Sequence, residues 1–182
     1  MHKMILAGYG GQGMLLCGQI LAYAAMQDNF HVTWLPSYGP EMRGGAASCA
    51  VVISEKPIGS PVVPSADLVA AMSQPAFDKY HASVAGGGIL LYHSALVTVA
   101  ERRPDIQYIG IDFSRLSAEL GNAKVANMIA LGSINELLKC VNVPALHAAL
   151  KYKFGKKKAD LLALNEKAIA AGMEAVQSAE KN

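Results

Sequence analysis

A glycine-rich turn near the start of the chain constrains the fold more than any other feature. Gly8, Gly10 and Gly13 follow the apolar run 4–7 and precede a stretch, 14–26, whose apolar side chains recur at helical spacing. Glycine permits a tight turn and a close backbone approach, and a helix that begins there presents free N–H groups and a partial positive charge. This strand–turn–helix pattern is typical of nucleotide-type α/β folds and favours an anion site at the turn.

The same turn lacks the acidic residue that an NAD site needs. In dinucleotide-binding folds a carboxylate about 20 residues further on, at the end of the second strand, holds the ribose. Here the second expected strand, 31–35, runs into Pro36 and Ser37, and Asp28 comes before that strand rather than after it. We therefore expect no NAD or FAD site. Two interpretations of the turn stay open: a site for another phosphate, and tight helix–sheet packing without a ligand.

A second unusual segment, 36–45, follows that strand with the sequence Pro-Ser-Tyr-Gly-Pro-Glu-Met-Arg-Gly-Gly. Its prolines restrict the backbone and its glycines permit unusual turns, which is typical of a shaped loop. Tyr38, Glu41 and Arg43 lie where α/β domains present binding groups, at the carboxyl end of a strand. A structural ion pair between Glu41 and Arg43 is the alternative. The density of prolines, glycines and charges favours a functional or interface loop.

The remaining pattern predicts a three-layer, Rossmann-like α/β domain with a mostly parallel sheet and a helical C-terminal part, as a single domain over 1–182. Pro36 should end the second strand, and the glycines at 86–88 should form a turn before another. The further expected strands are 46–54, 67–72, 89–92 and 107–111, and the further expected helices are 75–83, 117–120, 124–139, 144–151 and 157–178.

Composition excludes several classes of protein. The charged share is 16%, below the usual value of about 25%, which fits a surface partly covered by partner chains or a well-packed domain with a sparse surface. A net charge of +2 is too small to indicate nucleic acid binding. No apolar stretch reaches the ~20 residues that span a bilayer, and the N-terminus lacks the sections of a signal peptide. We therefore expect no membrane contact and a cytoplasmic location.

The three cysteines are far apart in sequence, so we expect no iron–sulfur or zinc site within this chain. The scattered histidines likewise suggest no metal cluster. Ser73 and Gln74 follow the strand 67–72 and open a helix, so they are candidates to line the same cleft as the glycine-rich turn. Asn127 is a polar residue within an apolar helix, and we expect it to be buried and hydrogen-bonded.

Three segments together carry a resemblance to a known family. The runs 8–13, 36–45 and 126–132 resemble the gamma subunit of 2-oxoacid:ferredoxin oxidoreductases, and the run 164–172 matches that family's C-terminal helix. The similarity covers essentially the whole chain. The Glu-Met-Arg-Gly-Gly run is more similar to the 2-oxoglutarate and branched-chain 2-oxoacid enzymes than to the pyruvate type.

The resemblance implies a role within a multi-subunit complex. Such complexes convert a 2-oxoacid and CoA to acyl-CoA and CO2 and reduce ferredoxin. Thiamine diphosphate, Mg and the iron–sulfur clusters would belong to alpha, beta and delta-type partner subunits, so this chain would hold no cofactor tightly and would be inactive alone. It would shape the CoA side of the active site and support assembly. The implied site residues are Gly10, Gly11, Gln12 and Gly13 in the turn, Tyr38, Glu41 and Arg43 in the loop, and Ser73 and Gln74 beside them.

If the chain has this role, Arg43 or the lysine cluster of 151–158 would attract the phosphates of CoA. The alternative interpretation of the lysine cluster is a solvent-exposed junction between two helices. Glu41 would order the loop. Three other functions stay open. The chain could be an independent nucleotide- or CoA-binding regulatory module, the beta subunit of an indolepyruvate oxidoreductase, or a purely structural scaffold subunit.

Overall fold

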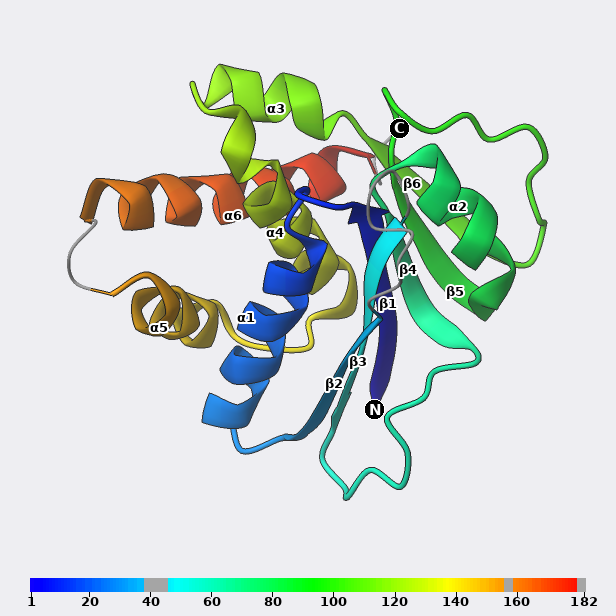
Figure 1. Cartoon of the computed structure of the whole chain (residues 1–182), viewed down its shortest axis with the longest axis horizontal. Helices are drawn as coiled ribbons and strands as arrows, with labels where there is room; N and C mark the ends of the chain where they lie inside the picture. Colours follow the sequence, from blue (N-terminus) through cyan, green and yellow to red (C-terminus); the bar gives the residue numbers. More distant parts are fainter. Residues whose placement is uncertain (38–45, 156–158, 180–182) are drawn as a thin grey trace.

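The computed structural model describes residues 1–37, 46–155 and 159–179, and Figure 1 shows their arrangement. The candidate loop residues Tyr38, Glu41 and Arg43 lie outside this range. In chain order the elements are β1 (His2–Tyr9), α1 (Met14–Gln27), β2 (His31–Ser37), β3 (Ala46–Ser54), β4 (Ala66–Ala71), α2 (Gln74–Tyr80), η2 (His81–Ser83), β5 (Val84–His93), β6 (Gln107–Ile111), α3 (Phe113–Glu119), η3 (Ala123–Val125), α4 (Ala126–Leu138), α5 (Val143–Phe154) and α6 (Ala159–Ala179).

The strands form one sheet in the order β2-β3-β1-β4-β5-β6. β1, β4, β5 and β6 pair in parallel, whereas β3 runs antiparallel to both of its neighbours, β1 and β2. All strands except β3 therefore point the same way, which confirms the expected mostly parallel sheet. The carboxyl ends of β1, β4 and β5 meet at one edge of the sheet, where α/β folds place ligands.

Helices cover the two faces of the sheet unequally. In Figure 1, α1, α4, α5 and α6 lie on one side and α2 lies on the other. Along β1, Met4 and Leu6 join the large core beneath the first group of helices, while Ile5 and Ala7 join the smaller core beneath α2. This alternation follows from the two-residue period of a strand. The arrangement confirms the three-layer α/β architecture.

Two of the C-terminal helices, α4 and α6, cross each other at close range. Gly132 of α4 and Gly172 of α6 lie at this crossing, and a Cβ atom on either glycine would collide with the carbonyl group of Ile169 or Ile129, respectively. The Ser133 hydroxyl donates hydrogen bonds to the carbonyl oxygens of Ile129, at 3.1 Å, and Gly172, at 3.0 Å. Gly132 and Gly172 thus allow α4 and α6 to approach this closely.

Two expectations about strand ends are wrong. Pro36 does not stop β2, because it pairs with Cys49 of β3 and the strand continues to Ser37. β2 is an edge strand, and an edge strand tolerates proline since one of its sides needs no hydrogen-bonding partner. The glycines at 86–88 lie inside β5 rather than before it. Gly87 has a φ of 77°, a conformation that glycine adopts readily, so the first part of β5 is irregular but the strand is not interrupted.

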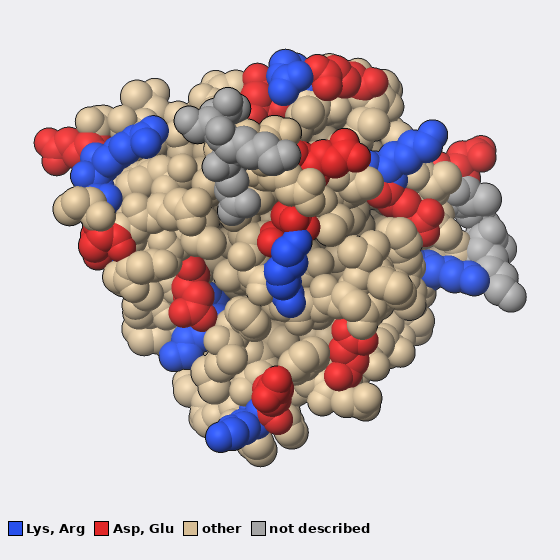
Figure 2. Space-filling view, turned by 180° about the vertical axis from the view of Figure 1, so that it is seen from behind, with Lys and Arg blue, Asp and Glu red and all other residues tan. Residues whose placement is uncertain are grey.

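Figure 2 shows the opposite face of the molecule, on which Lys and Arg side chains are scattered and mostly adjacent to Asp or Glu. No helix in the described ranges is both long and apolar enough to cross a bilayer. Within the same ranges, no three His, Cys, Asp or Glu side chains are grouped to hold a metal ion.

Candidate functional site

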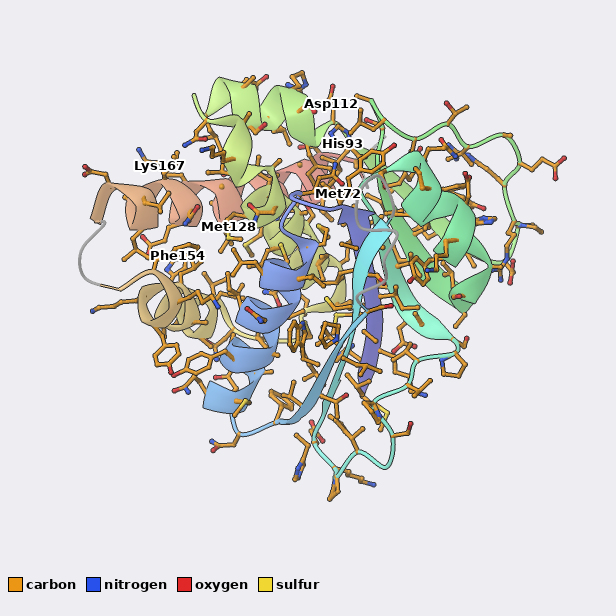
Figure 3. All side chains as sticks on the ribbon, viewed as in Figure 1. Met72, His93, Asp112, Met128, Phe154 and Lys167 are labelled. Atoms are coloured by element: carbon orange, nitrogen blue, oxygen red, sulfur yellow. The ribbon has the colours of Figure 1, made fainter. Side chains whose placement is uncertain are left out.

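A cavity of about 520 Å³ opens at the carboxyl edge of the sheet. It lies where the ends of β1, β4 and β5 meet α3 and the start of α4, and its volume is typical of small-molecule sites. Figure 3 places Met72 and His93 at this end of the sheet. The lining residues are Gly11, Gln12, Met72, His93, Leu96, Ser114, Ser117, Ala123, Lys124, Ala126 and Asn127.

Gln12 joins the ends of two neighbouring strands. Its Oε1 accepts a hydrogen bond of 2.6 Å from the Tyr9 backbone N–H, and its Nε2 donates one of 3.0 Å to the Met72 carbonyl oxygen. Gly8 makes room for this amide, because a Cβ on Gly8 would lie 2.5 Å from Gln12 Oε1 and 3.0 Å from Met72 Cβ. Gln12 is therefore the residue that fixes the turn against β4.

Gly13 and Asn127 fit together at the floor of the cavity. Gly13 is the N-cap of α1 with a φ of 77°, and a Cβ at this position would collide with the Asn127 side-chain amide. Asn127 is only 9% exposed, and its side chain has no hydrogen-bonding partner among the described residues. The expectation that Asn127 is buried is confirmed, and within the described residues only its backbone carbonyl, which accepts from Cys17 Sγ, is hydrogen-bonded to another side chain. Asn127 also lines the cavity, where a ligand could supply hydrogen bonds to its buried amide.

The electrostatics of the cavity favour an anion. Two helices, α1 and α4, begin at its wall, neither has a side-chain cap, and neither has an acidic residue in its first turn. Each helix N-terminus carries a partial positive charge. Lys124 lines the cavity as well, and no Asp or Glu is among its described lining residues. The arrangement can bind phosphate-like groups.

His93 closes the cavity beneath α3 and is only 2% exposed. Its Nε2 lies 2.9 Å from Ser114 Oγ, and its ring meets Phe113 edge-on with the ring centroids 5.5 Å apart. Burial lowers the pKa of His93, although the nearby Asp112 carboxylate opposes this shift. His93 is therefore neutral at physiological pH.

The structure brings only some of the sequence-predicted site residues together. Gly11 and Gln12 line the cavity and Gly13 lies directly behind it, whereas Gly10 is exposed in the turn. Ser73 is fully buried, and its hydroxyl accepts the Ala76 backbone N–H as the N-cap of α2.

Gln74 likewise has a structural role. Its Nε2 donates to Asp78 Oδ1 at 2.8 Å, and its Oε1 accepts the Thr98 backbone N–H at 2.8 Å. Neither Ser73 nor Gln74 is among the residues that line the cavity, where their neighbour Met72 lies instead. Ligand binding by these two side chains stays a prediction.

Sequence reasoning missed His93, Ser114 and Lys124. His93 is the last residue of β5 and Ser114 lies three residues after the last residue of β6, and these positions at the carboxyl ends of strands are the signal that could have found them. Lys124 carries no such signal, because it reaches the cavity through the 3₁₀ helix η3.

The chain matches a known family over nearly its full length. Residues 3–175 match the family model described as pyruvate ferredoxin/flavodoxin oxidoreductase. The 2-oxoglutarate synthase subunit KorC of Methanocaldococcus jannaschii is 38% identical over 173 residues, covering 91% of this chain and 92% of that protein. The ketoisovalerate oxidoreductase subunit VorA of Methanothermobacter thermautotrophicus is 38% identical over 174 residues, covering 94% of this chain. This chain spans only 36% of the length of VorA.

Solved structures agree with this match. The gamma subunit of a keto/oxoacid ferredoxin oxidoreductase from Geobacter sulfurreducens is 32% identical and superposes with a TM-score of 0.85, covering 98% of this chain and 100% of that chain. The fold is also similar to part of a 2-oxoglutarate:ferredoxin oxidoreductase from Magnetococcus marinus, at 23% identity and a TM-score of 0.88, covering 97% of this chain and 31% of that chain.

Proposed function

The chain belongs to the pyruvate ferredoxin/flavodoxin oxidoreductase family as a gamma-type member, and we propose that it works as the gamma subunit of a 2-oxoacid:ferredoxin oxidoreductase. In this proposal the complex converts a 2-oxoacid and CoA to acyl-CoA and CO2, and the electrons released reduce ferredoxin. Residues 1–182 form one gamma-type domain that is inactive alone and works in the cytoplasm.

We assign the described cavity to the CoA side of the reaction. The observation that carries this assignment is a lining that combines Lys124, an Asn127 amide with no hydrogen bond to any described residue, and the starts of α1 and α4, with no carboxylate among its described residues. CoA is rich in phosphate groups, and such a lining attracts phosphate. The chemistry itself needs groups beyond this chain: thiamine diphosphate, Mg and iron–sulfur clusters held by alpha, beta and delta-type subunits.

The Tyr38, Glu41 and Arg43 loop also has a place in this proposal. β2, which ends at Ser37 just before these residues in the sequence, points the same way as β1, so the carboxyl end of β2 lies at the edge of the sheet from which the cavity opens. We propose that Arg43 adds a positive charge for CoA or for a partner subunit, and that Glu41 orders the loop. Gly10, Gly11, Gln12 and Gly13 form the rigid base on which the ligand rests, with Ser73 and Gln74 holding the adjacent strand end.

We propose 2-oxoglutarate as the 2-oxoacid. KorC, named for 2-oxoglutarate, matches 91% of this chain over 92% of its own length, whereas VorA, named for ketoisovalerate, is equally similar but much longer. The second candidate is therefore ketoisovalerate.

The test is to tag the chain in its native host, purify it gently and identify the associated proteins by mass spectrometry. The proposal predicts recovery of a thiamine-diphosphate-binding subunit and a ferredoxin-like subunit, and CoA-dependent ferredoxin reduction that is faster with 2-oxoglutarate than with ketoisovalerate. Faster turnover of ketoisovalerate would reverse the substrate assignment alone. Recovery of the chain by itself, stable and binding CoA or ATP, would contradict the complex and support an independent regulatory module.

A further inference from the structure

His93 and Ser114 line the end of the cavity that β5 and α3 form. His93 belongs to the end of β5 and Ser114 to the first turn of α3. The imidazole makes two hydrogen bonds: Nδ1 lies 3.3 Å from the Ala95 backbone nitrogen, and Nε2 lies 2.9 Å from Ser114 Oγ. Because the ring is 98% buried, these contacts fix its orientation.

The backbone contact determines where the imidazole proton lies. The Ala95 N–H can only donate, so Nδ1 of His93 must be the acceptor. In a neutral imidazole the proton is then on Nε2, and Nε2 donates to Ser114 Oγ. His93 therefore cannot accept a proton from Ser114, which excludes a nucleophile–base pair of the kind found in serine hydrolases.

The position of the His93 proton also determines how the Ser114 hydroxyl can form hydrogen bonds. Its oxygen is occupied as an acceptor for His93, so its O–H is left to donate elsewhere. Among the described residues, the Ser114 hydroxyl forms no hydrogen bond other than the one with His93. The neighbouring Ser117 is different, because its own hydroxyl donates to the Ser114 carbonyl oxygen at 3.0 Å. Ser114 thus presents a hydroxyl donor at the cavity wall.

We propose that His93 is a positioning residue that holds the Ser114 hydroxyl as a donor to a phosphate oxygen of the ligand. This end of the cavity is then a second phosphate subsite, separate from the one at the start of α1, and Lys124 and Asn127 lie on the cavity wall with both. The inference rests on the proposed CoA role of the cavity. It adds that the ligand must carry more than one phosphate group to occupy both ends.

The test measures the KM for CoA of the assembled complex, with pantetheine, which has no phosphate, as the matched substrate. Ser114→Ala should raise the KM for CoA by about tenfold to a hundredfold, the loss expected for one hydrogen bond to a charged group, and should leave the KM for pantetheine unchanged. His93→Asn, which is too short to reach Ser114, should raise the KM for CoA by a similar factor. His93→Gln retains a donor amide near the Nε2 position and should restore most of the affinity.

The double variant His93→Asn with Ser114→Ala decides whether His93 acts through Ser114. The inference predicts no further rise in the KM for CoA beyond that of Ser114→Ala, because the two residues form one unit. Effects that multiply, or an equal rise in the KM for pantetheine, would overturn it in favour of a general structural role. Should His93→Asn fail to fold, Ser114→Ala with both substrates still decides.

The failure of this inference differs from the failure of the proposed function. If Lys124→Glu raises the KM for CoA and Ser114→Ala does not, the CoA role stands and the second subsite is wrong. If neither variant changes the KM for CoA, the cavity is not on the CoA side, and both are wrong.

Discussion

The side chain of Asn127 lies against Gly13 at the position that a Cβ atom on residue 13 would occupy. The turn after β1 and the start of α4, which are far apart in the sequence, therefore have complementary shapes. This contact joins two of the segments on which the family resemblance rests. It also brings the Asn127 amide, which has no hydrogen bond to any described residue, to the N-terminus of α1, where an anion would bind.

Gly13→Ala should destabilise the protein by about 2–4 kcal/mol, because it combines a positive φ with a collision against Asn127. Urea unfolding measures this change. Gly11→Ala is the matched control: its φ is 94°, but a Cβ there meets nothing within 4 Å, so it should cost only the conformational part, about 1–2 kcal/mol. Equal losses for the two variants would contradict the shape match.

Gln12→Ala should cost about 1–2 kcal/mol in the free energy of unfolding, since it removes both hydrogen bonds that tie Tyr9 and Met72 together. It should also raise the KM for CoA by loosening the turn. Gln27→Ala, at the exposed end of α1, is the control and should change neither quantity. A Gln12→Ala variant as stable as its parent would show that the bridge is dispensable.

Gly132→Ala and Gly172→Ala should each destabilise the protein by about 3 kcal/mol or more, because each Cβ would press on a helix carbonyl that cannot move aside. Soluble yield and thermal unfolding of the variants measure the effect. At Gly59 a Cβ meets nothing within 4 Å, so Gly59→Ala should behave like the parent. Normal stability in the two helix variants would mean that α4 and α6 are less close than the structure has them.

Acidification should destabilise the protein partly through His93. Burial lowers the pKa of His93 below its ordinary value of 6.5. The unfolded chain then gains a proton that the folded chain resists, so this stabilisation is present above pH 6.5 and is lost as the pH falls through the folded pKa. The free energy of unfolding should therefore drop more steeply between about pH 7.5 and about pH 5.5 for the parent than for His93→Gln, which retains the similarly shifted His2. Identical slopes would contradict a neutral, buried His93.

The sequence was sufficient to predict the α/β class and most helix positions, because apolar periodicity and cap residues act locally. Asp112, for example, caps the helix that follows it by accepting the Arg115 backbone N–H at 2.9 Å. The failures involve neighbours that are distant in sequence. Pro36 is tolerated because β2 lies at the sheet edge, a fact of strand order that no local pattern contains.

The candidate site was only half predictable for the same reason. The glycine-rich turn is local, so Gly11 and Gln12 could be found, whereas the place of Asn127 beside Gly13 and on the cavity wall depends on contacts between segments far apart in the sequence. The antiparallel direction of β3 could have been predicted from the sequence. The connection between Ser37 and Ala46 is too short for the crossover of about a dozen residues that a parallel neighbour requires.

The most direct test of the central claim is the KM for CoA of the assembled complex carrying Lys124→Glu. Charge reversal at the cavity should raise this KM by about tenfold or more, since attraction to phosphate becomes repulsion, and should leave the KM for the 2-oxoacid unchanged. Lys167→Glu, on the exposed surface of α6, controls for overall charge and should change neither KM (Figure 3). If Lys124→Glu leaves the KM for CoA at the parental value, the cavity does not serve CoA and the account is wrong.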